Sequence, residues 1–266
     1  MTSEQILTPS IRTGAPTWVE LCTHDPSGAA EFYSALFGWE FQDRGEAFGH
    51  YQMVNGPSGA IAGAMSSMVD ENGPTETPTT PTAWTIYLGT TDAEATVSAA
   101  LAAGGQILLP PMPIPTVGIM AVVTTPSGAA VGVWQPAPFS GFTVTMENST
   151  PVWFEQNSTQ FDADLDFYKK VFGWDAHDMP MEGGPRFVTN GADRDAVCGL
   201  YEAKGLSPSA GSQWHVYFAV TDCDEACEQA EELGGSVLSE PEDSPHGRFA
   251  NLADPQGALF DIIAMP

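Results

Sequence analysis

Positively charged residues are scarce in this sequence. Its 266 residues include 8 Lys and Arg against 34 Asp and Glu, which gives a formal net charge of −26. A field of this sign repels nucleic acid and anionic membrane surfaces, so neither is expected as a partner. Arg12 and Arg44 are the only Lys or Arg residues in the first 140 positions, which makes a multiply anionic ligand a poor fit there.

Long apolar runs are missing, and cysteines are few. No stretch approaches the length of a membrane span, and residues 1–16 contain no apolar run, so we expect no signal peptide and a cytoplasmic location. A disulfide framework is not expected from four scattered cysteines: Cys22, Cys198, Cys223 and Cys227. The last two lie four residues apart but have no further Cys or His beside them, which favours ordinary thiols over a metal pair.

An aromatic block occurs twice in the chain. Phe32-Tyr33 and Phe37-Gly38-Trp39 return as Phe167-Tyr168 and Phe172-Gly173-Trp174, at an offset of 135, and Trp18-Val19-Glu20 returns as Trp153-Phe154-Glu155. Farther along, residues 84, 87 and 92 match 214, 217 and 222 at an offset of 130, and Pro126-x-Gly128 matches Pro255-x-Gly257 at 129. Two copies of one unit, separated by small loop insertions, produce this pattern. The sequence therefore predicts two domains, at 10–138 and 148–266.

Each half shows the same order of elements twice. Residues 17–22 are typical of a strand, and Asp25 begins a helix with apolar residues at helical spacing that Gly38 ends. Residues 51–54 and 60–65 indicate a hairpin. A further strand and an Ala-rich helix follow at 83–88 and 92–103, and then strands at 107–109, 119–124 and 130–134. Two βαβββ units in each half, with hairpin-linked strands, indicate an α+β protein with mixed sheets.

These motifs resemble the vicinal oxygen chelate superfamily, which includes glyoxalase I, bleomycin-resistance proteins and extradiol dioxygenases. The resemblance rests on the strand–Asp–helix–Phe-Tyr-x-x-x-Phe-Gly-Trp pattern of both halves and on the Pro-x-Gly turns. More closely, the chain looks like a fused two-domain actinobacterial subgroup that carries glyoxalase-like, hydroxylase or kinase-binding labels. The resemblance implies a U-shaped mixed sheet around a cavity in each half, where metal-dependent members place His, Gln or Glu ligands on four strands.

The resemblance also implies where those metal ligands would lie. The corresponding positions are Trp18, Gly63, Thr85 and Gly132 in the first half, and Trp153, Gly199, His215 and Asp261 in the second. The first set cannot hold a divalent ion, and the second supplies two donors where a catalytic metal generally needs about three. We therefore expect no metal and no other cofactor. One alternative remains, in which Glu155 joins His215 and Asp261 as a third ligand.

The cavity faces that the resemblance implies contain aromatic side chains and a few polar groups. His215, Asp261 and Glu155 are the main acid/base candidates, with Glu20 and His246 as further ones. Candidates for substrate binding are Trp18, Tyr87, Trp134, Trp153, Asn157, Tyr201 and Tyr217. Plainer interpretations stay open: the aromatics are core residues, the glutamates keep a structural hydrogen bond, and His246 is a surface-loop residue.

Three functions remain as hypotheses. The first is a metal-independent enzyme that acts on a small neutral aromatic or carbonyl metabolite by acid/base chemistry in the second half. The second is a non-catalytic protein that sequesters a ligand or regulates a protein partner, and the third is a divalent-metal lyase or dioxygenase. A small-molecule ligand is expected in each case. The sequence names neither the substrate nor the reaction, and it leaves monomer and homodimer open.

Overall fold

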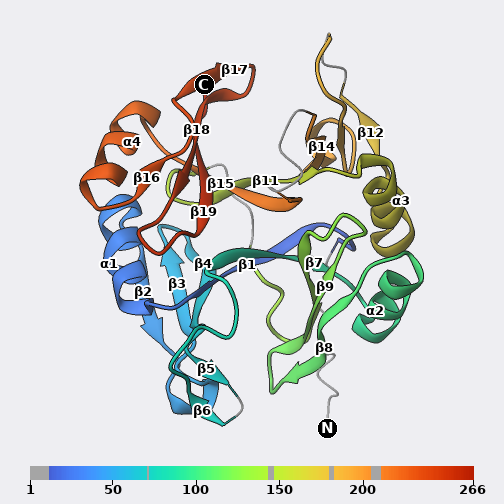
Figure 1. The fold of residues 1–266 in the computed structure, drawn as a ribbon, viewed down its shortest axis with the longest axis horizontal. Helices are drawn as coiled ribbons and strands as arrows, with labels where there is room; N and C mark the ends of the chain where they lie inside the picture. The colour runs from blue at the N-terminus through green and yellow to red at the C-terminus, as the bar shows by residue number, and fades with distance from the viewer. Residues whose placement is uncertain (1–11, 71, 143–146, 180–182, 205–210) are drawn as a thin grey trace, which may run out of the picture. The chain divides into compact units, whose positions relative to one another are not determined.

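The computed structural model describes residues 12–70, 72–142, 147–179, 183–204 and 211–266, and it contains four successive strand–helix–strand segments (Figure 1). The first half consists of β1 (Pro16–Thr23), α1 (Pro26–Phe37), β2 (Glu40–Asp43), a 3₁₀ turn (Glu46–Phe48), β3 (Gln52–Gly56), β4 (Gly59–Ser66), β5 (Val69–Asp70), β6 (Gly73–Pro74), β7 (Ala83–Gly89), α2 (Ala93–Ala102), β8 (Ile107–Ile114), β9 (Gly118–Thr124) and β10 (Ala130–Pro136).

The second half repeats this order. It consists of β11 (Pro151–Ser158), α3 (Phe161–Phe172), β12 (His177–Asp178), β13 (Phe187–Thr189), a 3₁₀ turn (Asp193–Asp195), β14 (Gly199–Glu202), β15 (Gln213–Ala219), α4 (Cys223–Glu232), β16 (Ser236–Val237), β17 (Glu242–Ser244), β18 (Gly247–Ala253) and β19 (Leu259–Ala264). The predicted α+β class with mixed sheets is confirmed. Within the described part, no helix is long and apolar enough to cross a membrane.

All four segments share one strand order. The first strand of each lies beside the last, in the runs β1-β4-β3-β2, β7-β10-β9-β8, β11-β14-β13-β12 and β15-β19-β18-β16. Residues 20–23 of β1 run parallel to β4, whereas β3 pairs with β4 and β2 in antiparallel fashion. In the second half, Tyr217 on β15 is in register with Asp261 on the parallel strand β19. This pairing brings the polar positions of the first and last strands together.

The chain forms two compact units that do not coincide with the halves of the sequence. Unit 1 contains Met1–Thr17, Tyr87–Gly141 and Gln156–Gln213, and unit 2 contains Trp18–Ile86, Phe142–Glu155 and Trp214–Pro266. Helices α2 and α3 pack together in unit 1, and α1 and α4 pack together in unit 2. The domain limits 10–138 and 148–266 remain a prediction, and the first of them begins before the described residues.

The predicted helix ends of α1 agree with the structure. Asp25 caps the helix by accepting a hydrogen bond from the Gly28 amide at 3.0 Å, which satisfies a donor that the first turn leaves unpaired. Gly38 follows the helix with φ 72°, in the left-handed region that glycine adopts at low cost. Asp92 caps α2 in the same way, through the Ala95 amide.

The duplicated aromatic block forms the core of both units. In unit 2, Tyr33 stacks on Trp39 at 5.4 Å between ring centroids, and the Trp39 indole donates to the Ser149 carbonyl. In unit 1, Tyr168 stacks on Trp174 at 4.3 Å, and the Trp174 indole donates to the Gly14 carbonyl. Buried indole and phenol groups need hydrogen-bond partners, and these contacts supply them. The repeated motif therefore has a structural role in the core rather than a role in chemistry.

Strand β8 is longer than predicted. The sequence predicted a strand over 107–109, but the strand continues to Ile114 through Pro110, Pro111 and Pro113. β8 stands at the end of its run, beside β9 alone. An edge strand accommodates proline because the outward-facing N–H positions have no ladder partner.

Candidate functional site

The candidate site lies in unit 2, on one face of strand β11. On this strand Val152 and Phe154 are buried, whereas Trp153 and Glu155 are half-buried. Side chains on a strand alternate between its two faces, so the first pair belongs to the core face and the second pair keeps access to solvent. The site therefore begins with an indole and a carboxylate that share a face.

His215 and Asp261 form a buried polar pair on neighbouring strands. His215 Nδ1 lies 2.9 Å from Asp261 Oδ2, and the two residues are 9% and 1% exposed. The other carboxylate oxygen of Asp261 accepts a hydrogen bond from the Asn251 side-chain amide. Ser239 in turn donates to Asn251 Oδ1 at 2.8 Å. Ser239, Asn251, Asp261 and His215 thus form a continuous chain of hydrogen bonds that fixes the orientation of the imidazole.

Opposing effects act on the pKa of His215. Burial favours the neutral imidazole and by itself would lower the pKa, but the Asp261 carboxylate and then the charge of Glu155 favour the protonated form. The net result is a pKa above the ordinary value of 6.5. His215 therefore keeps its proton to a higher pH than a free imidazole does, and an imidazole that can bind and release a proton suits acid/base chemistry.

Glu155 approaches the same pair from β11. Its carboxylate accepts hydrogen bonds from the Tyr217 hydroxyl at 3.3 Å and from the Trp153 indole at 3.4 Å. Burial raises the pKa of Glu155 above its usual 4.5, against the lowering influence of His215 and these two donors, while the charge of Asp261 raises it further. Glu155 therefore holds its proton to a higher pH than an exposed glutamate does.

The first half contains a related cluster, also in unit 2. Tyr51 accepts a hydrogen bond from the Trp18 indole at 3.0 Å and interacts with the Glu20 carboxylate. Burial first, and then the charge of Glu20, raise the pKa of Tyr51 well above 10. The position that corresponds to His215 is Thr85, so this cluster contains a carboxylate and a phenol but no imidazole.

The residues at the expected metal-ligand positions do not fit a divalent ion. Three of these positions are glycines, and an aromatic side chain of a nearby strand or loop occupies the place of each missing Cβ. A Cβ would come within 1.7 Å of the Tyr51 hydroxyl at Gly63, 2.3 Å of the Tyr87 ring at Gly132 and 2.5 Å of the Phe187 ring at Gly199. Longer ligand side chains would have to displace these rings.

The alternative metal set of Glu155, His215 and Asp261 does not fit either. Both Asp261 oxygens accept hydrogen bonds, one from His215 and one from Asn251. Among the described residues, no group of three or more His, Cys, Asp or Glu is arranged to hold a metal ion. The donor chemistry of the cluster suits proton transfer better than coordination.

Several of the predicted site residues lie in unit 1 rather than in unit 2. Tyr87 lies over Gly132, Trp134 donates through its indole to the Phe139 carbonyl at 3.3 Å, and Tyr201 packs beside Phe187. Asn157 is half-buried on the part of β11 that belongs to this unit.

His246 lies in unit 2, in the exposed turn between β17 and β18, where its amide bonds to Ser244. A role for His246 in the chemistry remains a prediction.

Three residues of the polar clusters were not foreseen from the sequence: Tyr51, Ser239 and Asn251. Asn251 shares the half-buried face of β18 with Phe249, whereas Ala250 and Leu252 are buried. This alternation was a usable signal, because a polar residue within an apolar strand needs a partner. Ser239 and Tyr51 come from loops, where periodicity carries no information about contacts.

Comparison with known proteins agrees with the fold and the duplication. Residues 16–133 match the family described as glyoxalase/bleomycin resistance protein/dioxygenase superfamily, and residues 153–263 match the glyoxalase-like domain family. The chain is 37% identical over 95% of both chains to a Mycobacterium tuberculosis protein named "Putative glyoxylase CFP32". It is 34% identical, over 95% of this chain and 94% of the other, to the anthracycline biosynthesis protein DnrV of Streptomyces peucetius.

A solved structure shows the same fold at low sequence identity. The Mn(II)-bound glyoxalase from Novosphingobium aromaticivorans superposes with a TM-score of 0.62 and 14% identity, over 96% of this chain and 83% of that one. Together with the two matched domains and the relatives above, this fold places the chain in a family of small-molecule-binding proteins. The chain belongs to the glyoxalase/bleomycin resistance protein/dioxygenase superfamily, the vicinal oxygen chelate superfamily that its repeated motifs resemble.

Proposed function

We propose that the cluster around His215 is a metal-independent acid/base site for a small neutral aromatic or carbonyl metabolite. The observation that carries the proposal is the 2.9 Å contact between His215 Nδ1 and Asp261 Oδ2, beside a glutamate whose pKa is raised. A buried His–carboxylate pair is an arrangement suited to general acid/base catalysis.

The hydrogen bonds assign a role to each group. Asp261 accepts from Nδ1, so the proton exchanged with a substrate is carried by Nε2. In its neutral form His215 removes a proton from a carbon or hydroxyl next to a carbonyl, and the imidazolium returns that proton to a neighbouring atom. In its protonated form, which its raised pKa favours, Glu155 donates to the carbonyl oxygen, where negative charge develops, and Tyr217 orients Glu155.

Charge and composition support the substrate class. The site face combines the Trp153 indole and the Tyr217 ring with few charges, and cations that would bind phosphate or several carboxylates are scarce in the chain. Two relatives carry names that place them in anthracycline biosynthesis. Anthracyclines are polycyclic aromatic compounds, which favours an aromatic ligand here.

A screen of neutral aromatic carbonyl compounds tests the proposal, with thermal shift as the binding readout and mass spectrometry of products as the turnover readout. His215→Gln removes the titratable nitrogen and keeps a side chain of similar size. It should reduce turnover about 10²–10⁴-fold and leave ligand-induced stabilisation in place. His24→Gln is the matched control, because His24 is a histidine bonded to Thr82, outside the cluster.

Two results would contradict the proposal. Turnover that survives His215→Gln would exclude the histidine as the proton carrier. Turnover that dialysis against a chelator abolishes, and that one divalent ion restores, would favour the metal enzyme instead.

A second candidate function is binding without chemistry, and the first-half cluster favours it. Tyr51, Trp18 and Glu20 form a polar cluster, but Thr85 stands where the second half has its histidine. Such a cluster recognises a hydroxyl or carbonyl group and lacks a base that works near neutral pH. If binding is the whole function, the screen will find ligands that stabilise the protein and yield no product.

A further inference from the structure

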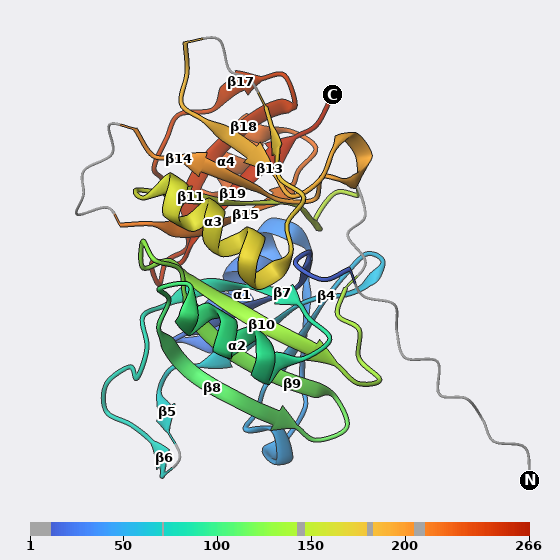
Figure 2. The ribbon, with the colours of Figure 1, turned by 90° about the vertical axis from the view of Figure 1, so that its right-hand side faces the viewer.

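The segment that forms α2, β8, β9 and β10 contains almost no charge. Between Glu94 and Glu147 the sequence has no Asp, Glu, Lys, Arg or His, although the chain as a whole carries a net charge of −26. In unit 1, α2 packs against β8, β9 and β10, as Figure 2 shows. This part of unit 1 therefore presents an uncharged surface on a strongly acidic protein.

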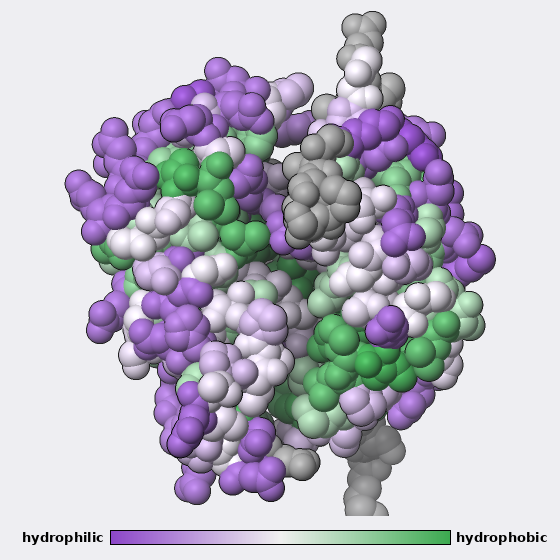
Figure 3. All heavy atoms as spheres, viewed as in Figure 1, coloured by the Kyte–Doolittle hydropathy of each residue, from purple (hydrophilic) through white to green (hydrophobic). Residues whose placement is uncertain are grey.

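Large apolar side chains are exposed on this surface. The exposed fractions are 57% for Leu108, 50% for Leu101, 40% for Met112 and 39% for Ile107. Figure 3 shows the corresponding apolar area over α2 and β8. We call Leu101, Ile107, Leu108 and Met112 the α2–β8 face. Half of the large hydrophobic residues that are exposed in the described part lie at this edge of unit 1, and exposed apolar residues gathered in this way mark interaction sites.

The prolines of β8 decide how a partner would dock. β8 is an edge strand, but Pro110, Pro111 and Pro113 have no N–H to donate to an added strand. A partner would therefore contact the α2–β8 face through side chains rather than extend the sheet.

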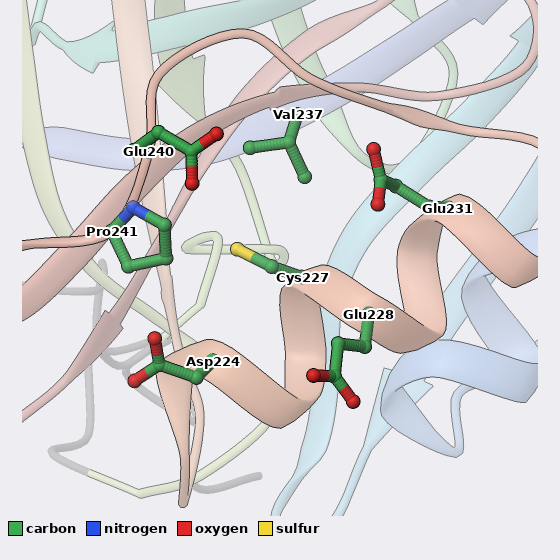
Figure 4. A pocket seen from close by; sticks show the side chains of 7 residues that line it. All are labelled: Asp224, Cys227, Glu228, Glu231, Val237, Glu240 and Pro241. Atoms are coloured by element: carbon green, nitrogen blue, oxygen red, sulfur yellow. The ribbon is translucent and has the colours of Figure 1, made fainter.

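The second half has an acidic groove at the corresponding place. The groove between α4 and the segment after β16 is lined by Asp224, Cys227, Glu228, Glu231, Val237, Glu240 and Pro241 (Figure 4). At the repeat offset of 130, Glu228 corresponds to Ser98, Glu231 to Leu101 and Glu240 to Pro110. Asp224 corresponds to Glu94, so the first half lacks three of the four carboxylates that line the groove of the second half.

We propose that the α2–β8 face is the contact between two copies of this chain in a homodimer. Two chains that each carry a net charge of −26 repel each other, and the repulsion is smallest where the surfaces in contact carry no charge. A two-fold axis places the same patch on both sides, so an uncharged patch meets another and no carboxylate is buried unpaired. A cationic partner would instead favour the acidic α4 groove.

Sedimentation velocity on the full chain, over a range of protein concentrations, tests the homodimer. The wild type should dimerise, and added NaCl should tighten the dimer because salt screens the repulsion between the chains. Leu101→Glu combined with Leu108→Glu should weaken dimerisation at least about a hundredfold, since each change places a carboxylate in an apolar contact. Leu238→Glu is the matched control at the repeat position of Leu108, with a similar exposure of 56%.

Hydrogen exchange supplies a readout that needs no variant. Amide protection in α2 and β8 of the wild type should rise with protein concentration, while protection in α4 stays constant. Circular dichroism and thermal unfolding confirm that the variants fold. A wild type that stays monomeric at every concentration and salt level would overturn the proposal. So would a dimer that Leu238→Glu disrupts as strongly as the double variant does, or one that no variant affects.

Discussion

Glu20 and Glu155 occupy the same position on the first strand of their halves, and their surroundings differ at two positions, where Thr85 and Gly132 correspond to His215 and Asp261. Each has a tryptophan two residues before it and a tyrosine hydroxyl beside its carboxylate. Next to Glu155 stands the His215–Asp261 pair, whereas the first half has Thr85 in the place of the histidine. The shared part of the clusters is suited to recognition, and the histidine pair adds the capacity to move a proton.

A second contrast concerns the outer surfaces of the two halves. Four carboxylates line the α4 groove, while Glu94 is the one carboxylate at the four corresponding positions of the first half. Duplicated segments share the constraints of a common core, so their cores stay alike. Their accessible faces are free to diverge: the α4 groove has charged residues that suit solvent, and the α2–β8 face has apolar residues that suit contact with another molecule.

The largest expected effect, on turnover, comes from giving the second-half cluster the residue that the first half has in place of the histidine. His215→Thr gives the second-half cluster the side chain that Thr85 supplies in the first. Turnover should fall about 10²–10⁴-fold, equivalent to about 3–5 kcal/mol at the transition state, because the proton carrier is lost. Steady-state kinetics measure the effect, with Thr85→Ala as the reference. Equal losses in both variants would mean that the contrast between the clusters has no catalytic meaning.

Asp261→Asn should have the next largest effect, on stability. Without the carboxylate, burial dominates and the pKa of His215 falls. Because the folded-state pKa of wild-type His215 exceeds its unfolded value, the stabilisation is complete below about pH 6.5 and is lost as the pH rises through the folded value. Denaturant unfolding should show a deficit of about 3 kcal/mol near pH 6 that shrinks towards pH 9. A nuclear magnetic resonance titration of His215 that shows no downward shift would contradict this cause.

Glu155→Gln should have a smaller effect on stability, and at high pH it should stabilise the protein rather than destabilise it. The folded-state pKa of Glu155 is raised, so wild-type stability is greatest below its unfolded value of 4.5 and declines as the pH rises through the folded one. Gln does not ionise, and the variant should therefore gain about 1 kcal/mol relative to the wild type towards pH 9. Thermal unfolding across this range measures the gain. A difference that does not vary with pH would exclude desolvation of the carboxylate as its origin.

Removal of the two tyrosine hydroxyls should have the smallest effects. Tyr51→Phe removes the acceptor of the Trp18 indole and should cost about 1 kcal/mol in the free energy of unfolding. Tyr217→Phe should cost less, because its hydrogen bond to Glu155 is longer, at 3.3 Å. Denaturant titration compares the pair. A larger cost for Tyr217 would show that the second-half cluster is the more tightly coupled of the two.

Local patterns predicted most of the fold. The caps at Asp25 and Gly38 follow from the chemistry of helix ends, and the aromatic repeat indicated the duplication. The extent of β8 was missed, because proline is compatible with a strand only at an edge, and edge position is a tertiary property.

The site could be predicted in part. His215 and Asp261 were expected together as acid/base candidates, and the structure places them in hydrogen-bond contact. Asn251 and Ser239, which complete the chain of hydrogen bonds, were not expected. Their contacts depend on register and loop path rather than on any local pattern.

The sequence by itself determined the duplication, the family, the asymmetry of the two clusters and the uncharged segment after Glu94, since these are properties of residue order and type. Only the tertiary structure decided which polar groups meet. It showed Asp261 bonded on both oxygens, aromatic rings over Gly63, Gly132 and Gly199, and units that combine segments from both halves. The physical reason is that contacts between distant residues arise from strand register and packing, which no single stretch of chain specifies alone.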